Sequence, residues 1–189
     1  MAFPPESIIP IVQEISQILI SRNETISVSE GACGGLLSAY LVSLQGASDW
    51  FQGGTLLYSL NSRLKLSGWS RTDIDNYTGP SEKVALRLAR NLRIELGSTY
   101  VLSETGIASE AVHKRKEFAG AIGTVYLGIS TPNGEISKVT NTGNEDRQIN
   151  MQEFAKLGLE FFLEELKKIV ENENKVIEEE ENGAKRSKS

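Results

Sequence analysis

A short extended segment, a glycine turn and a helical repeat follow one another here and constrain the fold more than any other feature. Residues 25–29 alternate apolar and polar side chains with the period of a strand. Glycines follow at Gly31, Gly34 and Gly35, and leucines then recur with helical spacing over residues 36–44. A strand that turns directly into a helix is the repeating unit of α/β proteins.

The rest of the chain repeats this alternation. The periodicity predicts helices over residues 8–19, 80–96 and 145–170, and strands over residues 54–58, 99–103, 121–130 and 135–142. The last two strands are joined by Pro132-Asn133-Gly134, which is typical of a hairpin. We therefore expect one α/β domain over residues 1–170, a three-layer α/β/α arrangement with a mixed sheet and helices on both faces. Residues 171–189 are rich in Glu, Asn, Lys and Ser and predict a disordered tail.

Composition excludes several classes of function. A net charge of −5 argues against a nucleic-acid partner, which would need a basic surface. No apolar run approaches the ~20 residues of a membrane helix, so we expect no membrane partner. A single cysteine, Cys33, and a single histidine, His113, leave no cluster for a metal site or a disulfide framework. We expect a cytoplasmic protein with no metal and no cofactor.

Ligands of open α/β sheets bind beyond the carboxyl ends of the strands, in the loops that lead to helices. Three loops qualify: residues 30–35, residues 58–63, and the polar stretch that begins at Glu104. We expect these loops to converge at one edge of the sheet.

The same loops carry a resemblance to a known family. Seven short motifs follow one another between residues 30 and 147. They are Glu30-Gly31-Ala32-Cys33-Gly34-Gly35, Gly46-Ala47-Ser48-Asp49-Trp50-Phe51, Gly53-Gly54-Thr55-Leu56-Leu57-Tyr58-Ser59, Ser81-Glu82, Thr105-Gly106-Ile107-Ala108, Gly123-Thr124-Val125 and Asp146-Arg147. In this order they resemble the C-terminal, nicotinamide-mononucleotide-amidase-like domain of the competence/damage-inducible protein CinA. None of the motifs is specific alone, whereas the ordered set makes coincidence an inadequate explanation.

The resemblance implies an activity and a set of site residues. Members hydrolyse the amide of nicotinamide mononucleotide to give nicotinic acid mononucleotide and ammonia, so the implied partner is a small pyridine nucleotide. The resemblance implies a catalytic serine in the first loop, with a tyrosine and a lysine in the second. We also expect a homo-oligomer. The matching positions assign substrate contacts to Glu30, Gly31, Gly34, Gly35, Thr105, Gly106 and Arg147.

This chain departs from the family at two of the three reactive positions. Gly31 stands in the serine position and has no side chain that could attack. Arg63 stands in the lysine position, and a guanidinium does not act as a base because it stays protonated. Tyr58 alone remains. We expect weak or altered amide hydrolysis, and the alternative is a non-catalytic protein that binds a nucleotide, a partner or further copies of itself.

Several residues allow two interpretations. Cys33 is a candidate for a relocated catalytic nucleophile at a helix N-terminus, although we favour a packed, unreactive thiol. Arg63 fits either a phosphate or carboxylate site or an exposed helix surface. Gly34 and Gly35 serve backbone geometry, and the helix they open is suited to a phosphate. Arg147, at a helix start where the dipole disfavours a cation, indicates a ligand or interface role.

Overall fold

In the computed structural model, which describes residues 3–110 and 120–186, the alternating segments form one five-stranded mixed sheet in the order β2-β1-β3-β4-β5. Strand β1 pairs in parallel with both β2 and β3, and β4 pairs antiparallel with β3 and β5. The strands are β1 (Ile26–Glu30), β2 (Phe51–Leu56), β3 (Tyr100–Ile107), β4 (Thr124–Thr131) and β5 (Gly134–Asn141). The expected mixed sheet with a late hairpin is confirmed.

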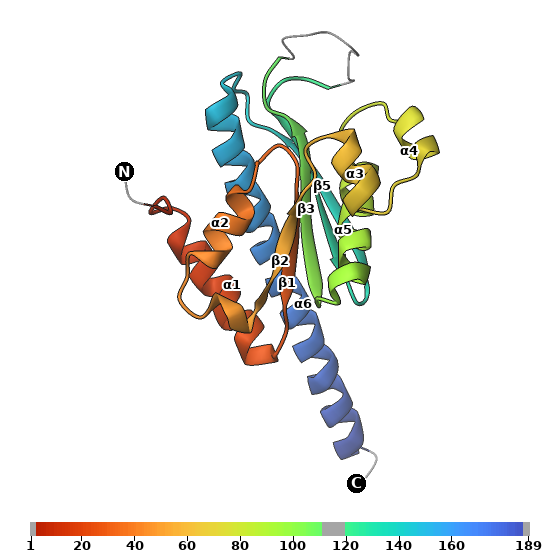
Figure 1. Cartoon of the computed structure of the whole chain (residues 1–189). Coiled ribbons are helices and arrows are strands. Elements are labelled where there is room, and N and C mark those ends of the chain that lie inside the picture. The colour runs from red at the N-terminus through yellow and green to blue at the C-terminus, as the bar shows by residue number, and fades with distance from the viewer. Residues whose placement is uncertain (1–2, 111–119, 187–189) are drawn as a thin grey trace.

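Helices cover both faces of this sheet (Figure 1). They are α1 (Ile9–Arg22), α2 (Leu36–Val42), the short 3-10 turn η1 (Ala47–Asp49), α3 (Leu60–Leu66), α4 (Arg71–Asp75), α5 (Glu82–Leu96) and α6 (Arg147–Arg186). One face is covered by α1, α2 and α6, and the other by α5 with α3 and α4 beside it. The expected three-layer α/β/α fold is confirmed.

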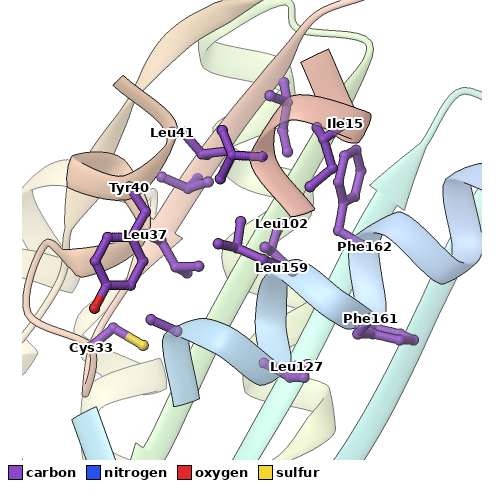
Figure 2. Packing of buried hydrophobic residues seen from close by; sticks show 14 of the residues in the cluster. Ile15, Cys33, Leu37, Tyr40, Leu41, Leu102, Leu127, Leu159, Phe161 and Phe162 are labelled. Atoms are coloured by element: carbon purple, nitrogen blue, oxygen red, sulfur yellow. The ribbon is translucent and has the colours of Figure 1, made fainter. Parts of the chain in front are cut away.

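The larger core lies between the sheet and the layer of α1, α2 and α6. Figure 2 shows Leu37 and Leu41 of α2 meeting Leu102 of β3, with Leu159 and Phe162 of α6 beside them. All five side chains are buried. Burial of such a side chain stabilises the fold by about 1.5–3 kcal/mol. This packing fixes α2 and α6 on the sheet, and both helices begin at the edge where the three loops meet.

The opposite layer approaches the sheet closely at one glycine. A Cβ atom on Gly128 of β4 would lie 2.8 Å from the backbone carbon of Ala85 in α5. A second, smaller core under α3 and α4 contains Leu57, Trp69, Tyr77 and Leu88. This smaller core holds one wall of the site described below.

Helix α6 is longer than the sequence analysis predicts. The expected end at Val170, followed by a disordered tail, is wrong for the described residues, because the helix continues to Arg186. Glu and Lys are good helix formers, and ion pairs join Arg22 to Glu173 and Lys167 to Glu14 at 2.6 Å, which ties the helix to α1. No described helix, α6 included, is long and apolar enough to cross a membrane.

Two further differences concern the loops. Residues 59–79 contain α3 and α4, which the apolar periodicity does not predict; each begins with a capping box, from Ser59 to Ser62 and from Ser70 to Asp73. The third loop begins later than expected, because β3 continues to Ile107 in register with Thr124 of β4.

Candidate functional site

A cavity of about 320 Å³ opens where the three loops meet, at the carboxyl ends of β1, β2 and β3. The residues around it come from all three loops, from the segment between α4 and α5, and from the start of α6: Gly31, Ala32, Tyr58, Leu60, Arg63, Tyr77, Pro80, Thr105, Gly106, Ile107, Ala108, Ser109, Glu110 and Arg147. The expected convergence of the loops is therefore confirmed. His113 lies outside the described residues.

Glu30 closes the first loop instead of lining the cavity. Its carboxylate accepts hydrogen bonds from the backbone N–H groups of Gly35, Leu37 and Ser38 at 2.8–3.0 Å, and from the Ser38 hydroxyl at 2.6 Å. These N–H groups are those that the start of a helix leaves unpaired. The N-terminus of α2, although suited to a phosphate, is therefore already filled by the side chain of Glu30. Gly34 and Gly35 do not line the cavity.

Glu104 supports the same loop from β3. Its Oε1 accepts hydrogen bonds from the backbone N–H groups of Gly31 and Cys33, each at 2.6 Å, and its Oε2 has no hydrogen-bond partner among the described residues. Complete burial raises the pKa of Glu104 to about 7, and the neighbouring charge of Glu30 acts in the same direction, against the two N–H donors. Two buried carboxylates thus hold the backbone of the first loop.

Cys33 lies in the hydrophobic core, as Figure 2 shows, and does not line the cavity. Burial raises the pKa of its thiol well above the usual value, and the charges of Glu104 and Glu30 raise it further. These effects oppose the small lowering expected from a helix N-terminus. The structure therefore places Cys33 as a packed thiol outside the lining of the cavity.

Gly31, in the nucleophile position, does line the cavity. A Cβ atom built on it would lie 3.4 Å from the carbonyl oxygen of Glu104 and 3.8 Å from Nη2 of Arg63. These are ordinary van der Waals separations, so the fold has room for a small side chain here. The absent side chain leaves space directly beside the guanidinium of Arg63.

Arg63 is the most unusual residue of the site, because it is a buried cation without a carboxylate partner among the described residues. Arg63 is only 4% exposed. Its guanidinium donates hydrogen bonds to the Thr105 hydroxyl at 3.2 Å and to the Leu57 carbonyl at 3.3 Å. Its Nη1 has no hydrogen-bond partner in the described chain. A buried charge is normally paired, so this guanidinium carries an unsatisfied demand for an anion.

Two aromatic rings hold Arg63 in place. Its guanidinium carbon lies 5.3 Å from the centre of the Trp69 ring and 5.0 Å from that of Tyr77. Arg87 lies over the same Trp69 ring at 5.0 Å and binds Asp73 with two hydrogen bonds, at 2.6 and 2.7 Å. Sequence reasoning did not assign Trp69 and Tyr77 to the site. The available signal was two aromatic residues within a polar segment that has two capping boxes.

Tyr58 and Arg147 form the mouth of the cavity. Tyr58 is 65% exposed, and its hydroxyl accepts a hydrogen bond from Arg147 at 2.9 Å. Arg147 also donates to the Ser109 hydroxyl at 3.3 Å. Asp146 caps α6 through the N–H groups of Gln148 and Ile149, which leaves the side chain of Arg147 free to face the mouth.

The remaining site positions have structural reasons of their own. Thr105 binds Arg63, as described above. Gly106 must lack a side chain because a Cβ atom there would lie 2.7 Å from the carbonyl oxygen of Thr124. Asn150 donates to the carbonyls of Ala108 and Asn144, each at 2.9 Å, and so fixes the third loop to α6. The structure thus gathers Gly31, Tyr58, Arg63, Thr105, Gly106 and Arg147 at one cavity.

Comparison with known proteins gives the same family from sequence and from structure. Residues 9–166 match the family model of the CinA C-terminal domain. A CinA-like protein of Trichormus variabilis is 33% identical over 123 residues, which are 65% of this chain and 29% of that protein. A CinA-like protein of Prochlorococcus marinus is 31% identical over 157 residues, 83% of this chain and 36% of that protein. The chain thus spans about a third of the length of the curated relatives it matches.

Solved structures share the fold over most of their length. The competence/damage-inducible protein CihA from Agrobacterium tumefaciens superposes with a TM-score of 0.77 at 20% identity, covering 86% of this chain and 98% of that one. A competence or damage-inducible protein from Enterobacter asburiae gives 0.76 at 16% identity, covering 86% and 99%. Since the family model covers most of the described domain, this chain belongs to the CinA C-terminal domain family.

Proposed function

We propose that the cavity binds an anionic pyridine mononucleotide and that this chain hydrolyses the amide of such a nucleotide slowly or not at all. The observation that carries the proposal is the pair of arginines, Arg63 and Arg147. Both line the cavity, and neither has a carboxylate partner among the described residues. Glu110 is the one carboxylate among the residues that line the cavity, so the described lining is net positive.

The size and walls of the cavity fit a small ring-bearing ligand. Its volume of about 320 Å³ lies at the lower end of the usual range for small-molecule sites. Tyr58 and Tyr77 contribute aromatic surface, and Leu60, Pro80 and Ile107 contribute apolar surface. An aromatic base with an attached phosphate combines the two properties that these walls recognise, apolar area and negative charge.

The described residues at the cavity do not supply a pair of nucleophile and base. Gly31 has no side chain, and Arg63 and Arg147 stay protonated. The hydroxyls of Tyr58, Thr105 and Ser109 are each hydrogen-bonded to an arginine and not to a base. Nucleophilic catalysis needs a base within hydrogen-bond reach of the nucleophile, so binding without efficient turnover is the function that this geometry supports best.

Thermal denaturation with a panel of pyridine nucleotides tests the proposal. A ligand present at a hundred times its dissociation constant stabilises the protein by about 2.7 kcal/mol, which gives a clear rise in Tm. Ammonia release from nicotinamide mononucleotide is measured on the same protein, and we expect turnover below about 1 per second. Faster turnover would show that the site is an efficient amidase, and a panel without any stabilising nucleotide would reject the nucleotide site.

Two arginine variants make the binding test specific to the cavity. Arg147→Gln removes the cation at the mouth, and we expect the stabilising effect of the nucleotide to fall. Arg90→Gln is the matched control, because Arg90 pairs with Glu135 far from the cavity lining. Equal ligand binding in both variants would place the nucleotide outside this cavity.

A further inference from the structure

The wall formed by Arg63 and Thr105 presents hydrogen-bond donors from both of its polar side chains. The guanidinium of Arg63 can only donate. The Thr105 hydroxyl accepts from Nη2 of Arg63, so its own hydrogen is left for another acceptor, and no such acceptor is found among the described residues. A ligand group that lies here meets a cation and a hydroxyl hydrogen, both of which call for acceptor atoms.

The space beside this wall is the one that Gly31 leaves open. A Cβ atom on Gly31 would be 3.8 Å from Nη2 of Arg63, so the region that a side chain would fill borders the guanidinium directly. Both Gly31 and Arg63 line the cavity. The two departures from the family pattern therefore fall next to each other, one removing a side chain and the other placing a permanent positive charge beside the gap.

From this juxtaposition we propose that the site selects a ligand bearing a carboxylate over the otherwise identical carboxamide, with Arg63 as the residue that determines the choice. The inference rests on the proposed function, because it concerns the same cavity and the same class of mononucleotide. It goes further by assigning the ring substituent: an acid, and not the amide.

The chemistry of the two groups accounts for the preference. A carboxylate has two acceptor oxygens and a negative charge, so it satisfies the Arg63 charge and both kinds of donor. A carboxamide is neutral, and its NH2 group would bring further donors towards a wall that already donates. A site built from unpaired buried polar groups discriminates strongly between ligands that do and do not satisfy them.

The surroundings of Arg63 strengthen this discrimination. The Trp69 and Tyr77 rings lie at 5.3 and 5.0 Å from the guanidinium carbon, and the residue is only 4% exposed. Water therefore screens this charge poorly, and an ion pair is stronger where screening is weak. Neither ring competes with the ligand for the charge as a carboxylate would. Trp69 is itself covered by Arg87, which Asp73 fixes through two hydrogen bonds, and this keeps the two rings in place around Arg63.

The test compares nicotinic acid mononucleotide with nicotinamide mononucleotide, which differ only in carboxylate against carboxamide. Dissociation constants are measured by calorimetry on the full chain at neutral pH. We expect the acid to bind roughly tenfold more tightly or better, as a charge-assisted hydrogen-bonded pair allows. Equal affinities, or tighter binding of the amide, would overturn the inference while leaving the proposed nucleotide site intact. Absence of binding by both nucleotides would reject the proposed function and this inference with it.

Variants then locate the preference. Arg63→Gln is expected to bring the two affinities within about twofold of each other, because the neutral glutamine side chain cannot form an ion pair with the carboxylate of the ligand. Arg147→Gln is the matched control: it should weaken both nucleotides by a similar factor and keep their ratio. Thr105→Val, a change of similar shape that removes the hydroxyl donor and keeps the charge, covers the case in which Arg63→Gln fails to fold. We expect Thr105→Val to reduce the ratio, and an unchanged ratio in either Arg63→Gln or Thr105→Val would contradict the assignment.

Discussion

The first loop and the segment of residues 59–79 differ in how their buried charged groups are paired. At the first loop, backbone N–H groups of the protein itself donate to the carboxylate of Glu30 and to Oε1 of Glu104. In the second segment, the guanidinium of Arg63 is held by aromatic rings and neutral oxygens and meets no carboxylate in the described chain. The first loop thus meets its two buried carboxyl groups with donors of its own, apart from Oε2 of Glu104, whereas Arg63 meets no anion in the described chain.

This difference reverses the usual assignment of roles in an α/β site. A glycine turn at the start of a helix is expected to bind the anion, yet here the helix start is filled by Glu30. The cationic groups of this cavity are side chains instead, Arg63 inside it and Arg147 at its mouth, and the proposed function assigns the anion to them. The first loop therefore shapes the cavity, while residues 59–79 and the start of α6 supply its positive charge.

Removing the internal anion of the first loop should have the largest effect. Glu30→Ala deletes the acceptor of four hydrogen bonds and leaves the N–H groups at the start of α2 unpaired. We expect the free energy of unfolding to fall by about 3–5 kcal/mol, since each unsatisfied buried donor is costly. Urea denaturation measures the change.

The matched control for this prediction is Glu82→Ala, which removes a carboxylate from the first turn of α5 where it bonds to the Ser137 hydroxyl at the surface. A loss below about 1 kcal/mol is expected there. If Glu30→Ala costs no more than Glu82→Ala, the first loop does not depend on its internal carboxylate and the comparison fails.

Glu104 makes the first loop sensitive to pH. Its pKa is raised from 4.5 to about 7 in the folded state, so the folded protein favours the protonated form. Below pH 4.5 the Glu104 carboxyl is protonated in both the folded and the unfolded state, so it costs the protein no stability. Between about pH 4.5 and pH 7 the unfolded state ionises first, so stability falls as pH rises, by at most about 3 kcal/mol. Above pH 7 the deficit is constant.

Glu104→Gln keeps the shape and one acceptor oxygen but cannot ionise, so it isolates this effect. Melting curves of both proteins between pH 4 and pH 8 give the difference in unfolding free energy, from which other titrating groups largely cancel. We expect wild type to lose stability relative to Glu104→Gln across this interval. A constant difference, or one that favours wild type at higher pH, would show that Glu104 is not held as a buried acid.

Sequence patterns were sufficient for the layers of the fold because its large elements repeat apolar side chains with a clear period. They failed where local chemistry decides the structure. Helices α3 and α4 are short and are fixed by serine capping boxes and by Trp69, not by an apolar stripe. The end of α6 was misplaced because a charged helix lacks the apolar periodicity that marks a buried one, although its residues favour helix.

For the candidate site, the sequence predicts that the three loops converge, and it names both arginines that line the cavity. Individual roles within the first loop depended on which way side chains point, and sequence does not give this. The sequence analysis assigns a substrate contact to Glu30, whereas the structure turns its side chain back onto α2, and Cys33 faces the core. The aromatic partners of Arg63, Trp69 and Tyr77, come together around the guanidinium only when the intervening segment has folded, so the sequence alone does not reveal them.

Replacing the Arg63 guanidinium by an amine that can act as a base, together with a hydroxyl at position 31, should create amide hydrolysis. Gly31→Ser combined with Arg63→Lys places a hydroxyl in open space beside an amine buried between aromatic rings. Burial lowers the pKa of a lysine and favours the neutral base. We expect ammonia release from nicotinamide mononucleotide at least about tenfold faster than in the parent, a modest share of what a positioned base can contribute.

Two controls separate the parts of this gain. Gly31→Ser alone keeps the protonated arginine and should stay at the parent rate. Gly31→Ala with Arg63→Lys supplies the same Cβ atom and the same amine without a hydroxyl, and should also stay inactive. Activity in the alanine control would mean that hydrolysis does not use the residue at position 31.

Changes at Cys33 should have the smallest effect on nucleotide binding, because its thiol is buried in the core and does not line the cavity. A helix N-terminus contributes about 0.3–1 kcal/mol to an exposed anion, less than one pKa unit. Burial and the charges of Glu104 and Glu30 raise the pKa of the thiol instead, so little nucleophilic thiolate exists at neutral pH. We expect slow alkylation by iodoacetamide at pH 7, at a rate that saturating nucleotide does not change, and rapid alkylation once urea unfolds the chain. Cys33→Ala should bind nucleotide with the parent affinity. Rapid alkylation of the folded protein that nucleotide blocks would place the thiol at the cavity, and the first loop would then supply a reactive group after all.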